Sequence, residues 1–203
     1  RLFASALARE LASEDPHAER LVRAHHETTR ALGRVAGVLA GEGSPAARVV
    51  FDFFLSTAIG VLVDATRAST FAVGDGIAVL NGEPHVFGPF PDNEPPYLGY
   101  GLLEGEATRL ALALGPSVPA EALESVLLGS DGVLDLDGLA ARAREGGEEV
   151  EPVVELRQFW DDDGFFRNPD RVRRQLTVIN RAHRGALADD TTLVVVRRRR
   201  GES

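Results

Sequence analysis

The chain has 203 residues and a formal net charge of −9, and 44% of its residues are hydrophobic while 26% are charged. This length suffices for a sizeable core, and we expect a single domain over residues 1–203. The absence of cysteine excludes disulfides, thiolate metal sites and a cysteine nucleophile, and the acidic balance argues against nucleic acid as a partner.

The sequence shows no sign of export or of membrane insertion. Its opening, "RLFASALARELASEDP", mixes acidic and apolar residues and lacks the basic start and apolar block of a signal peptide. No apolar run reaches the roughly 18 residues that a membrane span needs. We therefore expect a cytoplasmic protein with no membrane partner. Because the chain starts with Arg1 and contains no methionine, we also expect that an upstream segment is missing.

Helical spacing of apolar residues predicts the first elements. We expect helices over 1–12, 17–39 and 46–54, separated by breakers that contain proline or glycine. His25 and His26 lie in the second of these helices. A zinc-binding helix needs two histidines four positions apart, so we interpret this pair as part of a solvated helix face.

The pattern then changes to short segments rich in β-branched and aromatic residues. Strands are expected over 56–65 and 68–88, with Asn81-Gly82 as a hairpin turn inside the second segment. The segment 90–102 contains three prolines and is expected to be a loop. Two further strands are expected over 107–115 and 124–130.

The last third of the chain combines helical and strand patterns. It predicts a helix over 137–145 with Asp137 as its N-cap, an acidic loop over 160–169, a helix from Pro169 to about His183, and a strand over 191–199. The run "RRRR" at 197–200 is interpreted as the solvated end of that strand. Strands joined by hairpins, with helices grouped before and after them, indicate an α+β fold.

Three acidic motifs share one feature, an aspartate beside small residues at the end of an apolar strand. They are "FAVGDGIAV" with Asp75, "VLLGSDGVLD" with Asp131 and Asp135, and "GALADDTTLVVV" with Asp189 and Asp190. One such motif alone is weak, because Asp and Gly are common in turns. Carboxylates that lie close together repel unless a cation lies between them, and oxygen ligands suit Mg²⁺ or Mn²⁺. The three motifs together therefore predict a metal centre.

The ordered set "GDG", "LLGSDGVLD" and "ADDTTLVVV" resembles the metal-dependent protein phosphatases of the phosphatase 2C type, the PPM family, in their compact bacterial form. The resemblance covers residues 56–199, and the helical opening looks like the helices that follow the family's first metal motif. It implies a four-layer αββα sandwich, with two antiparallel β-sheets flanked by helices. It also implies hydrolysis of phosphoserine or phosphothreonine in a phosphoprotein substrate, with a cognate kinase as a further partner.

The resemblance also implies the roles of individual residues. Asp131 and Asp189 would bind the two core Mg²⁺ or Mn²⁺ ions, and Asp75, Asp131 and Asp135 would form an additional site for a third. Gly132 and Asp190 would support these ligands from beside them. The segment 146–170 would help to select substrates. No catalytic residue is assigned, because none of the histidines can be singled out as the general acid for the leaving alkoxide.

One part of the family pattern is absent from this chain. The family's first metal motif is an Asp-Gly before the first helix, and Asp15 and Asp64 do not match it, because Pro and Ala follow them. We expect this motif in an upstream segment. The alternative is a catalytically inactive phosphatase-like domain that binds a partner. A regulatory phosphatase that acts on anti-sigma-factor antagonists is a further alternative, which the metal motifs do not separate from a general phosphatase.

Overall fold

The computed structural model describes residues 1–41, 46–103, 112–136, 138–139, 155–168, 170–184, 187 and 190–199. The chain forms two compact units, each built from two stretches of sequence. The first contains Arg1–Asp75 and Phe87–Glu121, and the second contains Gly76–Val86 and Ala122–Ser203. The single domain predicted over residues 1–203 requires these two units to associate, and it stays a prediction.

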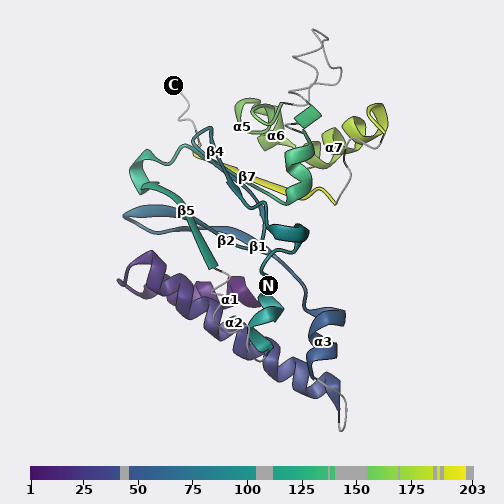
Figure 1. The fold of residues 1–203 in the computed structure, drawn as a ribbon. Helices are drawn as coiled ribbons and strands as arrows, with labels where there is room; N and C mark the ends of the chain where they lie inside the picture. Colours follow the sequence, from purple (N-terminus) through teal and green to yellow (C-terminus); the bar gives the residue numbers. More distant parts are fainter. Residues whose placement is uncertain are drawn as a thin grey trace. The chain divides into compact units, whose positions relative to one another are not determined.

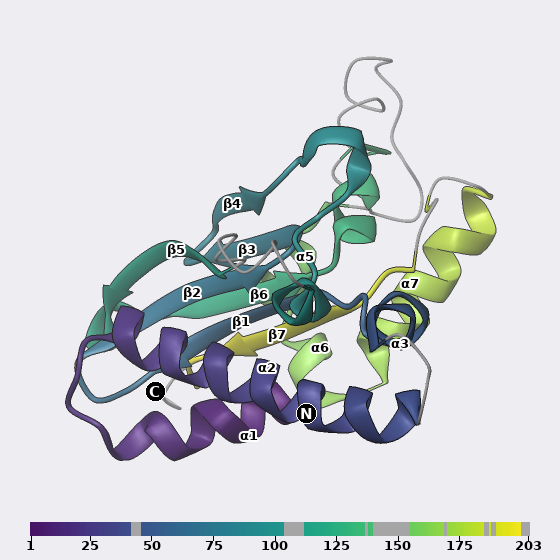
Figure 2. The ribbon, with the colours of Figure 1, turned by 60° about the horizontal axis from the view of Figure 1, so that its bottom comes forward.

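The first unit combines three helices with a three-stranded antiparallel sheet. The helices are α1 (Leu2–Arg9), α2 (His17–Ala40) and α3 (Ala46–Phe53), and the short 3₁₀ turn η1 (Glu10–Ala12) follows α1. The sheet has the order β1 (Ala58–Val63), β2 (Arg67–Val73) and β5 (Leu112–Pro119). Helices α1 and α2 lie side by side (Figures 1 and 2). The 3₁₀ turns η2 (Pro91–Asn93), η3 (Leu98–Leu102) and η4 (Ala120–Ala122) complete this unit, apart from the last residue of η4.

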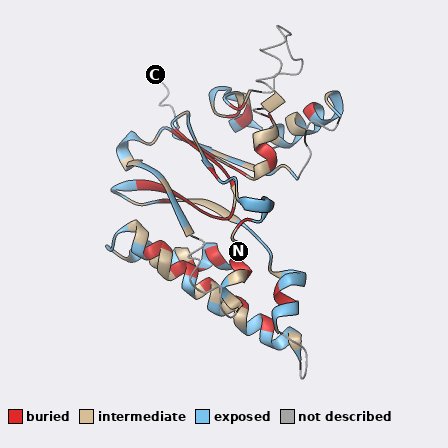
Figure 3. Cartoon of the chain, viewed as in Figure 1, coloured by how far each residue is buried: buried red, intermediate tan, exposed pale blue. Residues whose placement is uncertain are grey.

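The core of the first unit forms where the helices meet one face of the sheet. Successive residues of a strand point to opposite faces, so Phe71 and Val73 of β2 lie on the same face. Phe3 of α1 stacks on Phe71 with 5.4 Å between the ring centroids, and Leu21 and Ala24 of α2 join the same buried cluster. The buried residues of α2 recur every three or four positions, which gives the helix the buried stripe shown in Figure 3.

The second unit combines a four-stranded antiparallel sheet with helices. The strand order is β4 (Glu83–Phe87), β3 (Gly76–Leu80), β6 (Ser125–Gly129) and β7 (Leu193–Arg197), and Phe87 itself belongs to the first unit. The helices are α5 (Gln158–Asp161), α6 (Gly164–Arg167) and α7 (Arg171–Ala182), and the 3₁₀ turn η5 (Asp131–Val133) follows β6. The core contains residues of both layers: Ile77, Val79 and Leu127 from the strands, and Phe159, Phe165 and Ile179 from the helices.

These observations confirm the α+β class with two antiparallel sheets flanked by helices. The hairpin at Asn81-Gly82 is confirmed as well, since both residues have the positive φ angles, 53° and 87°, that a tight hairpin turn requires. Within the described residues, no helix is long and apolar enough to cross a membrane. The cytoplasmic location stays a prediction.

Two sequence-based expectations about these elements are wrong. The acidic segment 160–169 is not a loop, because α5 and α6 form there, with Phe165 buried in the core. His25 does not belong to a solvated face: only 7% of it is exposed, whereas His26 is exposed as predicted. The predicted loop 90–102 is confirmed, since it contains neither an α-helix nor a strand, only the short 3₁₀ turns η2 and η3. The predicted cap Asp137 and most of the predicted helix 137–145 lie outside the described residues.

Candidate metal centre

Strand β6 carries the second acidic motif at its end. The strand is buried among its neighbours, and it ends at Gly129, after which Ser130 leads into the turn η5. A side chain at position 129 would collide with the turn, because a Cβ atom there would lie 2.7 Å from Cγ2 of Val133. Because position 129 is glycine, the turn can fold tightly against the end of the strand, and this contact fixes the position of Asp131.

Hydrogen bonds join the second motif to the third. The backbone N–H of Ser130 donates to the carbonyl of Thr192 at 3.0 Å, and the N–H of Thr192 donates to Ser130 Oγ at 3.0 Å. Ser130 Oγ in turn donates to the carbonyl of Asp190 at 3.0 Å, and Thr191 Oγ1 donates to the carbonyl of Gly132 at 3.4 Å. Residues 130–132 and 190–192 therefore lie side by side, although some sixty positions separate them.

The two aspartates of the second motif occupy neighbouring turns. Asp131 is half-buried, and its Oδ1 accepts a hydrogen bond of 2.8 Å from the N–H of Gly132, which orients the carboxylate. Asp135 is also half-buried and lies four positions later, in the helical residues 134–136 that continue η5. The N–H of Gly132 thus donates to Asp131 and its carbonyl accepts from Thr191 Oγ1, while its role in supporting metal ligands stays a prediction.

The turn that holds Asp75 depends on the glycines on both sides of it. Gly74 and Gly76 have φ angles of 96° and 140°, which residues other than glycine rarely adopt. A Cβ atom at Gly74 would also lie within 2.3 Å of Thr57 Cγ2. Asp75 is half-buried and directly precedes β3 in the chain. It belongs to the first unit, whereas Asp131 and Asp135 belong to the second, so their predicted association stays a prediction.

The predicted ligand Asp189 lies outside the described residues. Within the part of the chain that the structure describes, no group of three or more His, Cys, Asp or Glu side chains could hold a metal ion. The donors that are present fit a hard cation, because Asp131 and Asp135 offer carboxylate oxygens on adjacent turns and cysteine is absent. The assignment of all four ligands stays a prediction.

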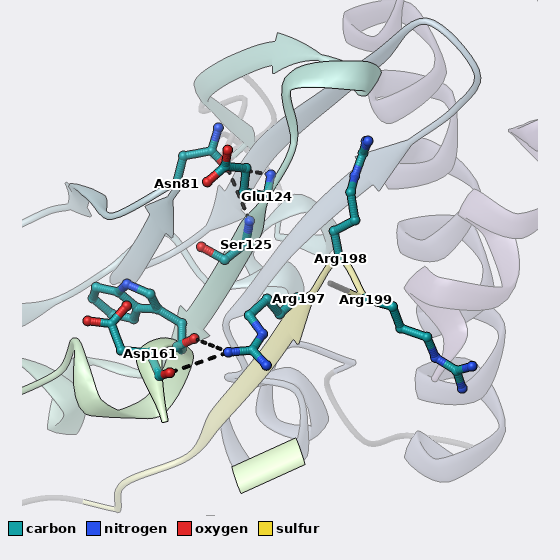
Figure 4. Close-up of a pocket in the computed structure, with 8 residues that line it drawn as sticks. Asn81, Glu124, Ser125, Asp161, Arg197, Arg198 and Arg199 are labelled. Carbon is teal, nitrogen blue, oxygen red and sulfur yellow. Dashed lines mark hydrogen bonds between the residues drawn. The ribbon is translucent and has the colours of Figure 1, made fainter. Parts of the chain in front are cut away.

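A pocket of about 390 Å³ lies at the opposite end of this sheet, where β6 begins and β7 ends (Figure 4). Arg197 lines it and is only 13% exposed in its side chain. Its guanidinium donates to the carbonyls of Trp160 and Asp161 at 3.0 and 3.4 Å, pairs with Asp163 at 2.5 Å, and lies over the ring of Phe166. The first arginine of the terminal run therefore holds α5 and α6 against β7, which corrects the interpretation of a solvated strand end for Arg197, whereas Arg198 and Arg199 are exposed as predicted.

The first unit contains a buried polar cluster that the sequence did not indicate. His17 Nε2 lies 2.7 Å from Asp64 Oδ2, and His17 Nδ1 lies 2.8 Å from Ser69 Oγ. Arg20, only 1% exposed, donates to the same Asp64 oxygen at 2.8 Å. Hydrogen bonds from the backbone N–H of Thr66 and from His17 hold the pKa of Asp64 well below its ordinary value. This cluster joins the first turn of α2 to the turn between β1 and β2.

Comparisons with known proteins give one similarity. No protein-family model matches the chain, and no curated protein matches it. Two solved structures of the phosphatase domain of the cell fate determinant SpoIIE from Bacillus subtilis are similar to it, the first determined after presoaking with Mn. The first has 12% identity and a TM-score of 0.40 over 99% of this chain and 75% of that domain. The second has 11% identity and a TM-score of 0.39 over 100% and 74%. At this level the likeness assigns no residue role and no activity to this chain.

Proposed function

We propose that this chain is a metal-dependent phosphatase domain that hydrolyses phosphoserine or phosphothreonine in a phosphoprotein substrate. The observation that carries the proposal is the set of hydrogen bonds that holds the Ser-Asp-Gly motif at 130–132 beside the Asp-Thr-Thr segment at 190–192. The second and third of the three acidic motifs are thereby adjacent in the second unit, with a half-buried carboxylate at Asp131.

The proposal assigns the metal ligands as follows. Asp131, Asp135, Asp75 and Asp189 would hold Mg²⁺ or Mn²⁺. When bound, two such cations lower the pKa of a water nucleophile and neutralise charge on the phosphoryl oxygens. The chain would orient the site: Gly132 fixes one oxygen of Asp131 by its N–H, and the bonds of Ser130 prevent the turn from moving away from the strand that follows Asp189 and Asp190. Rigid support of this kind is what a metal site requires of its surroundings.

The proposal is tested by replacing Asp131. We expect Asp131→Asn to abolish Mn²⁺-dependent hydrolysis of a phosphothreonine peptide and of p-nitrophenyl phosphate, because the amide removes the negative charge that binds the cation. Asp52→Asn is the matched control, since Asp52 is exposed and its only described ion pair is the 3.6 Å contact with Arg48. Turnover of Asp131→Asn equal to that of the parent protein would contradict the proposal.

Asp135→Ala separates the core metal ions from the additional one. If Asp135 serves only the additional site, isothermal titration with Mn²⁺ should show fewer bound ions, while part of the binding remains. Complete loss of binding would assign Asp135 to the core instead. A parent protein that binds a phosphopeptide and shows no metal-dependent turnover would favour the alternative of a catalytically inactive phosphatase-like domain.

A further inference from the structure

A second pocket of the same unit lies beside the candidate metal centre. It has a volume of about 540 Å³, within the range of small-ligand sites, and the third-motif residues Asp190 and Thr191 form part of its wall. These two residues contact the second motif through the carbonyl of Asp190 and the hydroxyl of Thr191. A molecule in this pocket would therefore lie next to the residues that are proposed to carry out the reaction.

One face of α7 forms another part of the lining. Arg173, Thr177 and Asn180 line the pocket at spacings of four and three, which places them on one side of a helix. Leu176 and Leu187 also line it, and both pack against the core of the second unit. The lining thus combines two leucines with a larger polar surface, which suits a ligand that has both apolar and polar groups.

The charge of this part of the lining is opposite to that of the whole chain. Helix α7 carries four arginines and no acidic residue in "RVRRQLTVINRA", whereas the chain has a net charge of −9. Arg171 is paired with Asp162 at 2.6 Å. Arg173 is exposed and makes no ion pair with any residue that the structure describes. Its guanidinium is therefore available to an anionic group that enters the pocket.

We propose that this pocket binds the part of the substrate peptide that flanks the phosphorylated residue, and that Arg173 selects an acidic side chain there. An aliphatic side chain of the same peptide would lie on Leu176 and Leu187, while the phosphorylated residue extends toward Asp131. The inference rests on the proposed function, which it deepens by naming the substrate class: phosphopeptides with acidic and aliphatic residues beside the phosphorylated one. The positive charge of Arg173 favours an acidic side chain at its own part of the lining, on α7, whereas the acid of the lining, Asp190, lies on the segment bonded to the second motif.

The test compares two neighbouring arginines of α7 on three substrates. The substrates are a phosphothreonine peptide with glutamates beside the phosphorylated residue, the same peptide with lysines instead, and p-nitrophenyl phosphate. We expect Arg173→Gln to lower the ratio of kcat/KM for the acidic peptide to that for p-nitrophenyl phosphate about tenfold, mainly through KM. Arg174→Gln, an exposed arginine outside the pocket, should leave this ratio unchanged.

Charge reversal sharpens the test. Arg173→Glu should shift the preference from the glutamate peptide toward the lysine peptide, which a loss of folding would not produce. The proposal is overturned if Arg173→Gln leaves the ratio unchanged, or if Arg174→Gln lowers it equally.

Failure of the proposed function can be told apart from failure of this inference. If the parent protein hydrolyses none of the three substrates, fluorescence anisotropy with the labelled acidic phosphopeptide still measures peptide binding to the pocket. Weaker binding by Arg173→Gln than by Arg174→Gln would then support peptide binding in the pocket and contradict the proposed phosphatase activity. Equal binding by both variants would contradict the pocket, whatever the result for hydrolysis.

Discussion

Asp64 shows how a single carboxylate can organise a buried cluster. Its Oδ2 faces both His17 and the buried Arg20, while its Oδ1 accepts hydrogen bonds from the N–H groups of Thr66 and Arg67. Arg20 also has two buried nitrogen atoms, Nε and Nη2, without a hydrogen-bond partner among the described residues. Removal of the charge on Asp64 would therefore leave a buried guanidinium without its one described counter-ion, which is costly.

The pH dependence of stability tests this role of Asp64. Because the folded state lowers the pKa of Asp64, its stabilising effect is complete above the ordinary aspartate pKa of about 4 and is lost as the pH falls further toward the folded value. We expect Asp64→Asn to lower the urea midpoint strongly at pH 7, and the difference from the parent protein to shrink below about pH 4. Asp52→Asn is the exposed control. A difference that stays constant down to pH 2 would contradict the role.

His25 also makes the folded protein less stable in acid, but from a higher pH than Asp64. Burial lowers its pKa, and the nearby His26 lowers it further, because the folded state disfavours the charged imidazolium. The unfolded chain takes up the proton more readily, so the folded protein loses stability as the pH falls below about 6.5. Neither ring nitrogen of His25 has a hydrogen-bond partner among the described residues.

We expect His25→Leu to reduce the loss of stability between pH 7 and pH 5, as measured by thermal unfolding at several pH values. A leucine would fill a similar volume and carries no titrating group. His26→Gln should keep most of the pH dependence, since it removes only the smaller of the two causes. Equal pH dependence in His25→Leu and the parent protein would show that His25 does not titrate in this range.

At the scale of elements, glycines determine where the acidic turns can form. The turn that presents Asp75 needs a positive φ at Gly74 and space for the side chain of Thr57 beside it. The turn after β6 needs the close approach of Gly129 and Val133. In both cases, a strand ends at or next to a position where only glycine fits: Gly74 because of its backbone conformation, and Gly129 because of its close contact. The acidic residues are thereby placed at the ends of rigid strands.

Two glycine-to-alanine substitutions test this requirement, and we expect them to change the free energy of unfolding in opposite directions. We expect Gly74→Ala to lower the free energy of unfolding by about 1–3 kcal/mol, through backbone strain and the contact with Thr57. Gly37 lies inside α2, and a Cβ atom there would meet nothing within 4 Å. Gly37→Ala should therefore raise the free energy of unfolding by about 0.5–1 kcal/mol. Urea unfolding of both variants measures the two effects, and a neutral Gly74→Ala would refute the strained turn.

At the scale of the whole molecule, metal binding should be linked to folding. If Asp131 and its partners hold a cation only when the chain is folded, Mn²⁺ at one hundred times its dissociation constant adds about 2.7 kcal/mol to the free energy of unfolding. We expect Mn²⁺ to raise the melting temperature of the parent protein and EDTA to reverse the rise. Asp131→Asn should show a much smaller rise. An equal rise in both proteins would place the bound metal elsewhere.

Much of the fold could be predicted because local patterns reflect local physical preferences. Helical spacing predicted α1, α2, α3 and α7, and Asn81-Gly82 predicted its hairpin from the φ angles that those residues accept. The sequence predicts a loop over 160–169 because its three consecutive acids obscure the apolar Phe165, which the core buries. Acidic composition is a weak guide where the acids are paired with arginines, as Asp162 is with Arg171.

The sequence by itself determined the kinds of element, the positions of the acidic motifs and the restriction of side-chain donors to oxygen and nitrogen, because these follow from residue type and short-range spacing. Only the tertiary structure decided which distant residues meet. The pairing of β6 with β7 brings Ser130 to Thr192, and the packing of α2 brings Arg20 to Asp64. Such contacts depend on strand register and on the burial of whole faces, which arise from the summed packing of many side chains and leave no local pattern in the chain.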